Sequence, residues 1–418
     1  MNIMTRHVPN DWRLEKLGQL FEERKEKVSD KEYLPLSVTK QGIVPQMEHV
    51  AKSDDSDNRK RVAAGDFVIN SRSDRRGSSG LSELDGSVSL INMVLKPRHG
   101  HARFIHHLMR SYAFQEEFYR FGHGIVADLW TTRYSELKGI TVALPDEETQ
   151  KEIADFLDRE TARIDQLIEK KKRLIEMLEI RFSSYVNEVM SGYEARKLKT
   201  LASAQLSNVD KHIYDDESEV NVVHYTDAYY NDLITKETPL PIGSVTSLEK
   251  QKFILKGGEV IVTKDSETPD DIAIPVYIES VKENTVCGYH LAIIRPKPNL
   301  LDGKFLFWSL KTKKVRDYFS LAAQGVTRFG IPIGKISDCP MPYTSNTEEQ
   351  ARLGTDLFTK NFRKNELVKN IQSSIERLKE FRTSLITEAV TGQLDIKTWK
   401  KKRGTDKCLD NIEEAMAS

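Results

Sequence analysis

Mostly apolar residues recur at alternating steps of four and three through a long charged segment near the middle of the chain. This seam consists of Leu157, Thr161, Ile164, Ile168, Lys171, Ile175, Leu178, Phe182, Tyr185 and Val189. The heptad spacing predicts a helix that packs lengthwise against another helix. Acidic residues after Pro145 suit its start, and Gly192 suits its end. We expect about 45 residues, or roughly 65 to 70 Å of helix; a helix within an ordinary bundle is the alternative.

The same pattern returns 200 positions later. Gln350 corresponds to Gln150, and Gly392 corresponds to Gly192. Six residues of the second segment fall on the seam of the first once 200 is subtracted: Val368, Ile371, Ile375, Leu378, Leu385 and Ala389. The endings VMSG and AVTG are nearly identical. Two unrelated helices would not share register, length and stop signal, so an internal repeat is indicated.

The repeat also covers the segments before the long helices. Residues 104–124 align without gaps to residues 305–325, and residues 63–72 resemble residues 256–265. Each half therefore reads as short strands with an amphipathic helix, followed by a long helix, which is an α+β fold. The predicted segments are a first globular domain at residues 1–146, a long helix at 147–192, a second globular domain at 193–346, a second long helix at 347–394 and a tail at 395–418.

Two like halves in one chain can imitate a dimer with pseudo-twofold symmetry. Equivalent helices that pack across such an axis run antiparallel, so we expect an antiparallel coiled coil. Lys171 and Asn361 lie on the seam, and polar seam residues can fix the register at some cost in stability. Two binding domains held by a rigid spacer suit an extended periodic partner, of which duplex DNA is the most regular.

Charge and composition narrow the class of protein. Lysine plus arginine and aspartate plus glutamate both total 63, so the formal net charge is zero. This argues against a purely electrostatic DNA binder but leaves room for locally basic faces. The chain has no apolar run of about 18 residues and no apolar segment near its N-terminus, so we expect neither a membrane span nor a signal peptide. Three widely spaced cysteines fit a reduced cytoplasm.

The wording of the first long helix resembles a known family. Residues 153–165 read Ile-Ala-x-x-Leu-Asp-x-x-Thr-x-x-Ile-Asp, and this region is similar to the central conserved region of specificity subunits of type I restriction-modification enzymes. Residues 346–394 resemble the distal conserved region of that family, although they lack the Leu-Asp-x-x-Thr wording. Residues 325–342 resemble the segment that closes a target recognition domain. The resemblance covers nearly the whole chain before the tail.

The resemblance implies a function without catalysis by this chain. Each globular domain would be a target recognition domain that reads one half of a split sequence in double-stranded DNA. The paired helices would set the gap and dock two methyltransferase subunits, with Asp158, Thr161 and Asp165 as candidate docking residues. Two restriction subunits would complete a cytoplasmic complex. No cofactor is expected on this chain, since S-adenosylmethionine, ATP and magnesium would bind the partner subunits.

The candidate DNA contacts of the first domain follow a predicted strand. Arg72, Arg75, Arg76 and Ser78 lie among serines and glycines, where arginine can pair with guanine or clamp phosphate and glycine permits close backbone approach. A solvated surface loop is the alternative. The matching segment of the second half, residues 262–271, is acidic, and Lys264 is its best-placed cation. The two domains are therefore predicted to read different half-sites.

A second group of candidates precedes the last strand of each domain. Arg133 follows two threonines in the first half, and Thr327 precedes Arg328 in what we interpret as a similar place in the second. A hydroxyl beside an arginine can bind phosphate, although a structural loop explains both segments equally well. Three tyrosines could pack against sugars or bases, but we interpret them as core residues of a strand: Tyr225, Tyr229 and Tyr230.

Several features invite other interpretations. The Gly-x-Gly-x-x-Ala of residues 122–127 follows a predicted helix, so its context does not suit dinucleotide binding. Four neighbouring histidines lack interleaved carboxylates or cysteines, which favours basic surface over a metal site: His99, His101, His106 and His107. The basic run at residues 397–404 is predicted to be solvated. A coiled-coil scaffold with protein-binding end domains is the main alternative function, and we find no methylation motif or P-loop for an enzyme.

Overall fold

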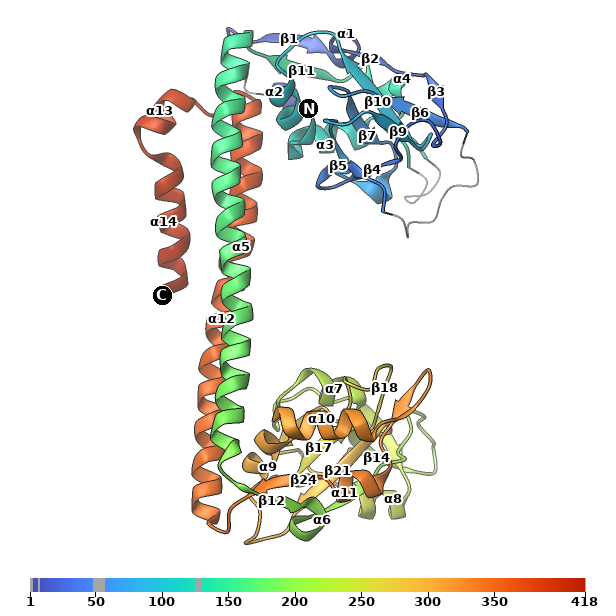
Figure 1. Cartoon of the computed structure of the whole chain (residues 1–418), viewed down its shortest axis with the longest axis vertical. Helices are drawn as coiled ribbons and strands as arrows, with labels where there is room; N and C mark the ends of the chain where they lie inside the picture. The colour runs from blue at the N-terminus through green and yellow to red at the C-terminus, as the bar shows by residue number, and fades with distance from the viewer. Residues whose placement is uncertain (1–2, 7, 48–56, 125–129, 418) are drawn as a thin grey trace. The chain divides into compact units, whose positions relative to one another are not determined.

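The computed structural model describes residues 3–6, 8–47, 57–124 and 130–417. The chain divides into two compact units, and each contains one globular domain with parts of both long helices (Figure 1). The first unit consists of Met1–Arg173 and Asn370–Ser418, and the second consists of Leu174–Lys369. The predicted five-segment division separates helices from domains instead, and its boundaries remain a prediction.

The first unit is built on short antiparallel strands. Its main sheet has the order β2-β10-β7-β8, and three smaller sheets are formed by β3-β6-β9, β4-β5 and β1-β11. The main-sheet strands are β2 (Phe21–Glu23), β7 (Phe67–Asn70), β8 (Ser79–Leu81) and β10 (Asn92–Pro97). The smaller sheets comprise β1 (Arg13–Lys16), β3 (Lys27–Val28), β4 (Leu36–Thr39), β5 (Gly42–Pro45), β6 (Arg59–Val62), β9 (Gly86–Val88) and β11 (Thr141–Leu144). Val94 and Val68 are paired in register and fully buried, so the core lies under the sheet.

The second unit repeats this plan with a longer sheet. Its order is β13-β21-β17-β19-β15, from Ala202–Leu206, Leu291–Pro296, Val260–Thr263, Pro275–Ile278 and Leu233–Ile234. The sheet β16-β14-β20 uses Ile242–Val245, Ser218–Val223 and Thr285–Cys287, and β12 (Glu194–Lys197) pairs with β24 (Pro340–Tyr343). One core cluster joins Trp308 and Phe305 to Val186 of the first long helix and Leu357 of the second. Packing against the sheet therefore holds both helices in this unit.

The two predicted long helices are α5 (Glu147–Ser191) and α12 (Thr347–Val390). In the first unit, Asp165 of α5 pairs with Arg382 of α12. In the second unit, Glu179 pairs with Lys364, and the Lys360 ammonium donates to the Tyr185 hydroxyl at 2.9 Å. Within the second unit the α12 partner number falls from Lys364 to Lys360 as the α5 number rises from Glu179 to Tyr185, so the helices run antiparallel there. This confirms the predicted coiled coil.

The polar seam residues have partners. The Lys171 ammonium lies 2.8 Å from the Glu413 carboxylate in the tail, and the Asn361 amide donates to Asp232 at 2.8 Å. Both residues are more than nine-tenths buried. A buried polar group without a partner is costly, so these contacts make both residues tolerable on an otherwise apolar seam.

The internal repeat extends to equivalent hydrogen bonds of Gln150 and Gln350 in the two units. Gln150 accepts from the His101 backbone N–H, just before α2 (Ala102–Arg110), at 2.8 Å. Its amide donates to the Pro145 carbonyl at 2.9 Å. Gln350 likewise accepts from the Asp302 N–H before α9 (Gly303–Leu310) at 2.8 Å, and donates to the Thr344 carbonyl at 2.7 Å. Each glutamine thus ties the start of a long helix to the first helix of its own domain.

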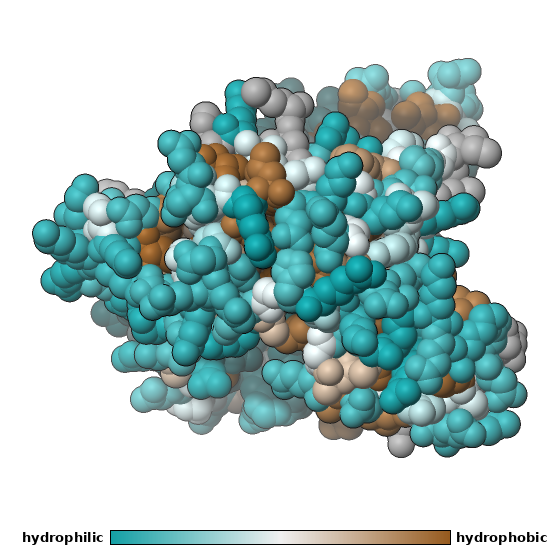
Figure 2. Space-filling view, turned by 90° about the horizontal axis from the view of Figure 1, so that it is seen from above, coloured by the Kyte–Doolittle hydropathy of each residue, from teal (hydrophilic) through white to brown (hydrophobic). Residues whose placement is uncertain are grey.

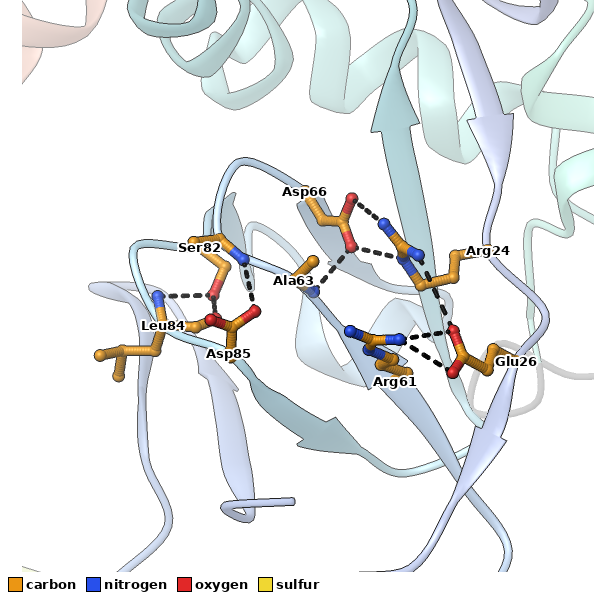
Figure 3. A network of polar contacts seen from close by, with 9 residues as sticks. Arg24, Glu26, Arg61, Ala63, Asp66, Ser82, Leu84 and Asp85 are labelled. Carbon is orange, nitrogen blue, oxygen red and sulfur yellow. Dashed lines mark hydrogen bonds and ion pairs between the residues drawn. The ribbon is translucent and has the colours of Figure 1, made fainter. Parts of the chain in front are cut away.

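A buried carboxylate at the start of the central strand also repeats. Asp66 accepts from the Ala63 N–H at 2.8 Å and receives two hydrogen bonds from Arg24, at 2.7 and 3.1 Å (Figure 3). Figure 3 shows Arg61 and Arg24 both directed toward Glu26. In the second unit Glu259 accepts from the Lys256 N–H at 3.0 Å and from Arg295 at 2.8 Å. These guanidinium groups are therefore paired with carboxylates inside the domain.

The tail, whose basic run was predicted only to be solvated, forms two helices. Its lysines at 400–402 are exposed as expected, but the segment forms α13 (Ile396–Lys401) and α14 (Gly404–Ala417). Asp406 of α14 lies 2.6 Å from Arg163 of α5, and Glu413 meets Lys171. Complementary charges therefore hold α14 beside α5. The composition of the tail does not predict this contact.

Polar residues cover most of the molecular face in Figure 2, where apolar residues form small separate patches. In the part of the chain that the structure describes, no helix is long and apolar enough to cross a membrane.

Candidate nucleic-acid interface

The 70–80 loop of the first unit is held by a short backbone ladder. Arg72 forms an isolated bridge with Thr131, and Thr131 forms another with His123. The Thr132 N–H donates to the Ser71 carbonyl at 3.0 Å. The ladder brings the segment of Arg72 beside the segment of Arg133, which is 61 positions later in the sequence. Two of the predicted contact segments are therefore neighbours.

The four predicted residues of this loop differ in availability. Arg72 and Arg75 are exposed, and the Arg75 guanidinium lies 3.6 Å from Asp74. Arg76 pairs with Glu116, and its guanidinium lies 4.9 Å from the centre of the Tyr119 ring. Ser78 is only 6% exposed, and its backbone N–H donates to the Arg75 carbonyl at 2.9 Å. Ser78 is thus held within the loop while Arg72 and Arg75 face solvent, and the DNA contact of Ser78 remains a prediction.

Arg133 is exposed at the start of α4 (Tyr134–Leu137). Its backbone N–H donates to the Glu136 carboxylate at 2.8 Å, which caps the helix. This leaves the guanidinium projecting from a fixed backbone beside the ladder. Cations on a rigid support suit a phosphate backbone, because little conformational freedom is lost on binding.

The second unit has the same ladder, formed by short strands where the first unit has isolated bridges. Asp265 of β18 (Asp265–Ser266) pairs with Gly330 of β23 (Phe329–Gly330), and Gly330 pairs with Gln324 of β22 (Gln324–Gly325). Gly330 therefore takes the place of Thr131, and Asp265 takes the place of Arg72. The predicted contrast between a basic and an acidic loop is present at one equivalent backbone position.

Arg328 lies in the turn between β22 and β23, within a polar cluster. Its guanidinium lies 3.2 Å from His290 Nδ1, and His290 also pairs with Asp265. His290 has a backbone φ of 68°, which residues other than glycine rarely adopt. Local strain of this kind concentrates at functional sites. The Lys264 ammonium lies 5.1 Å from the centre of the Tyr289 ring, so this predicted cation is near the same cluster.

The cluster opens into a groove of about 700 Å³ whose lining includes Thr327, Arg328 and three tyrosines. Tyr225 and Tyr229 stack with ring centres 5.6 Å apart, and Tyr230 is 78% exposed. The tyrosines lie on α7 (Tyr225–Tyr230) and line the groove, so their interpretation as core strand residues is wrong. Three tyrosines in six positions also fit a short helix, and the strand prediction came from the valines before them.

The Tyr229 hydroxyl donates to Asp271 at 2.6 Å. This hydrogen bond to the carboxylate, together with burial, raises the pKa of Tyr229 to about 12. Tyr229 is thus a fixed neutral ring, and it supports the more exposed Tyr230, whose ring centre lies 4.9 Å away. An exposed aromatic ring on a rigid support can stack on a base or a sugar.

Arg133 and Arg328 do not occupy equivalent places, contrary to the prediction. By the ladder, Arg133 corresponds to Pro332, which precedes α11 (Ile333–Ser337) as Arg133 precedes α4. Arg328 lies two residues before the ladder position Gly330, and its counterpart near residue 129 falls outside the described residues. The turn that leads to the ladder position differs in length between the two halves, from His123 to Thr131 in the first and from Gln324 to Gly330 in the second, so an alignment of the sequences does not reveal this shift.

The three candidate docking residues of α5 have partners within the first unit. Asp158 binds the Arg103 side chain and His107 Nε2 of α2, the latter at 2.7 Å. Burial acts to raise the pKa of Asp158, but the hydrogen bonds from His107 and Arg103 outweigh it and lower the pKa. Thr161 is 6% exposed and donates to the Leu157 carbonyl at 2.7 Å. These contacts give the residues structural roles; their docking role remains a prediction.

Asp165 is the most accessible of the three. Its carboxylate receives two hydrogen bonds from Arg382, at 2.9 and 3.1 Å, and its side chain is 51% exposed.

Among the described residues, no group of three histidines, cysteines or carboxylates could hold a metal ion. His99 instead lies 2.7 Å from Glu15, and His107 faces Asp158.

No family model matches the chain, and no curated protein matches it. Solved structures do. The chain is similar to one from a structural study of complex assembly and conformational transition of the type I R-M system, with 14% identity, a TM-score of 0.73, and coverage of 93% of this chain and 100% of that chain. It is also similar to the HsdS subunit from Thermoanaerobacter tengcongensis, with 16% identity, a TM-score of 0.53, and coverage of 94% and 100%. These likenesses show the fold.

Proposed function

We propose that this chain is the DNA specificity subunit of a type I restriction-modification complex. The observation that carries the proposal is a fold shared over 93% of this chain and all of a chain from such a system. The exposed cations on the ladder of the first unit and the groove of the second unit support the same function. Neither the fold likeness nor the sites require chemistry by this chain, so the proposed role is recognition without catalysis.

Each globular domain would read a different half of a split target. Arg72 and Arg75 suit guanine, whose O6 and N7 can both accept from one guanidinium, or a phosphate oxygen. Asp265, at the equivalent ladder position, suits an amino group such as that of cytosine. Since Asp265 also binds His290, the second unit would combine this acceptor with Arg328 and Tyr230.

The antiparallel helices would set the gap between the half-sites and dock two methyltransferase subunits. Two restriction subunits would complete the complex, and S-adenosylmethionine, ATP and magnesium would bind to those partners. Asp165 is the docking candidate with the most exposed carboxylate, although its pairing with Arg382 means that a partner would have to share or displace that contact.

The test is assembly of this chain with its methyltransferase subunits, followed by methylome sequencing of cells that express them. We expect adenine methylation in a split motif that is lost when this chain is deleted. Exchange of residues 1–145 for those of another specificity subunit should change one half of the motif only. Equal affinity of the assembled complex for random and target duplexes at high salt would contradict recognition and favour a scaffold role.

A heptad added to each long helix, with paired insertions that keep the two seams in register, provides a second measurement. We expect a longer gap and unchanged half-sites, because a spacer contributes distance and no base contacts. A change in either half-site would contradict the modular function of the domains.

A further inference from the structure

A pocket of about 440 Å³ in the first unit is lined by cationic and polar side chains from the β4–β5 turn, α2, α3 (Tyr112–Arg120) and α12. Four of its lining residues carry fixed positive charge: Lys40, Arg76, Arg110 and Arg382. No carboxylate occurs among the described residues that line it. Like charges converge here without a counter-charge inside the pocket, which is unfavourable unless an anion binds.

Two of these cations have acidic partners outside the pocket. Arg76 pairs with Glu116, and Arg382 pairs with Asp165. Lys40 is exposed and Arg110 is half-buried, and neither forms an ion pair with any carboxylate in the described part of the chain. Lys40 and Arg110 therefore contribute the uncompensated charge.

Arg110 is contacted by two neutral groups. Its guanidinium lies 3.2 Å from His106 Nε2, and a second nitrogen donates to the Lys40 carbonyl. Burial, with the positive charge of Arg382, lowers the pKa of Arg110. A guanidinium has five N–H donors, so these two contacts orient the group and leave donors available. The arrangement is a positioned cation whose charge is not neutralised.

The corresponding cation of the second unit is neutralised. In the alignment of residues 104–124 with residues 305–325, Arg110 corresponds to Lys311. Lys311 pairs with Asp232 and lies 4.9 Å from the centre of the Phe307 ring. The repeat thus shows how this position is satisfied within the protein. The first unit lacks that solution, so the missing negative charge is expected from a ligand.

We propose that the pocket of Arg110 and Lys40 binds a phosphate group, and specifically a backbone phosphate of the DNA that the first unit reads. The proposal rests on the proposed function for its source of phosphate. Arg76 belongs both to the 70–80 loop and to the pocket lining, so the pocket continues directly from the loop with the exposed Arg72 and Arg75. A duplex that contacts the loop presents phosphates to the neighbouring surface.

Salt dependence of DNA binding tests this proposal with the full chain bound to its methyltransferase subunits. For Arg110→Ala and Lys40→Ala, we expect the slope of log Kobs against log salt to fall by about 0.9 each, the value for one phosphate contact. Target and non-target duplexes should be weakened by the same factor, since phosphate contacts carry no sequence information. Lys31→Ala, an exposed cation that does not line the pocket, is the matched control.

Lys40→Ala keeps the test decisive if Arg110→Ala does not fold, because Lys40 is exposed. Unchanged slopes in folded variants would overturn the proposal and leave Arg110 as a structural link between α2 and the β4–β5 turn. Calorimetry with inorganic phosphate separates the two sources of the ligand. Phosphate binding that is lost in Arg110→Ala while the DNA slopes stay unchanged would overturn the DNA assignment in favour of a free anion. Failure of the proposed function looks different, because wild-type protein would then not distinguish target from random duplex.

Discussion

Asp265 holds in the second unit the backbone position that Arg72 holds in the first. Arg72 bridges to Thr131, which bridges to His123, and Asp265 pairs with Gly330, which pairs with Gln324. The repeat therefore preserves the backbone ladder while it reverses the charge of the side chain. Under the proposed function, this exchange of charge on an equivalent backbone would let the two domains recognise different sequences.

Arg72→Ala is predicted to relax recognition of one half-site. If Arg72 contacts a base, the loss should be about 1 to 3 kcal/mol of discrimination at one position of that half-site, with the other half unchanged. Competition binding with duplexes that vary one base pair at a time measures this. A uniform loss of affinity for all duplexes would instead assign Arg72 to a phosphate.

Tyr230→Ala is predicted to weaken DNA binding without unfolding the protein. Tyr230 is 78% exposed, so removal of its ring leaves no cavity. Stacking on a base contributes about 1 to 3 kcal/mol. Fluorescence anisotropy gives the affinity, and thermal unfolding shows whether the fold is intact. Exposed Leu248, which does not line the groove, provides the control as Leu248→Ala.

Gln150→Leu is predicted to destabilise the first unit. The substitution leaves the His101 N–H and the Pro145 carbonyl without their partner, and Gln150 is only 2% exposed. Each unsatisfied buried group costs about 1 to 3 kcal/mol. Urea unfolding measures the loss, and Glu152→Ala on the exposed face of α5 should change the free energy of unfolding by less than about 0.5 kcal/mol. Equal effects of both substitutions would contradict the role of Gln150 in tying α5 to the start of α2.

The Asp165–Arg382 pair is predicted to matter little for folding. It is an exposed ion pair, which typically contributes about 0.2 to 1 kcal/mol, and a double-mutant cycle with Asp165→Asn and Arg382→Gln measures it. If Asp165 docks a methyltransferase subunit, Asp165→Asn should weaken assembly by more than it weakens folding. Assembly that follows stability in every variant would assign the pair to the coiled coil alone.

His106 is predicted to make the first unit less stable in acid. The Leu81 N–H lies 3.3 Å from its Nδ1 and the Arg110 guanidinium lies 3.2 Å from its Nε2, so both ring nitrogens face donors. Burial, with the positive charge of Arg110, lowers the pKa of His106 from 6.5 to about 3. The unfolded chain therefore takes up a proton below about pH 6.5 that the folded chain does not, and stability falls as the pH is lowered from there toward pH 3.

The contribution of this one group is at most about 1.4 kcal/mol per pH unit. Urea unfolding across this range should show a smaller decline for His106→Asn than for wild type. His123→Asn alters a histidine whose side chain is 71% exposed and should leave the decline unchanged. A decline of the same size in both variants would show that carboxylates cause the acid sensitivity.

The pattern along the chain predicts α5 and α12 well because a heptad seam is a local property. Leu157 and Ile164 must lie on one stripe in any helix that contains them, and the repeat at Leu357 and Ile371 makes a partner helix available. The antiparallel pairing follows from two equivalent helices in one chain. The structure agrees in the second unit, through Glu179 with Lys364 and Tyr185 with Lys360.

The candidate sites were only partly predictable, because side-chain availability depends on neighbours that are distant in sequence. Arg72 and Arg76 look alike in the loop, yet only Arg76 has Glu116 and Tyr119 beside it. The sequence predicts Tyr225 and Tyr230 to be strand residues, but in the structure they lie on α7 and line the groove.

By itself, the sequence determined the repeat, the long helices and the contrast between a basic and an acidic loop, since each is written in spacing or charge. Only the tertiary structure decided which cations have a carboxylate beside them, because that depends on residues far apart in the sequence. Lys40 and Arg110, for example, are brought together across 70 positions of chain.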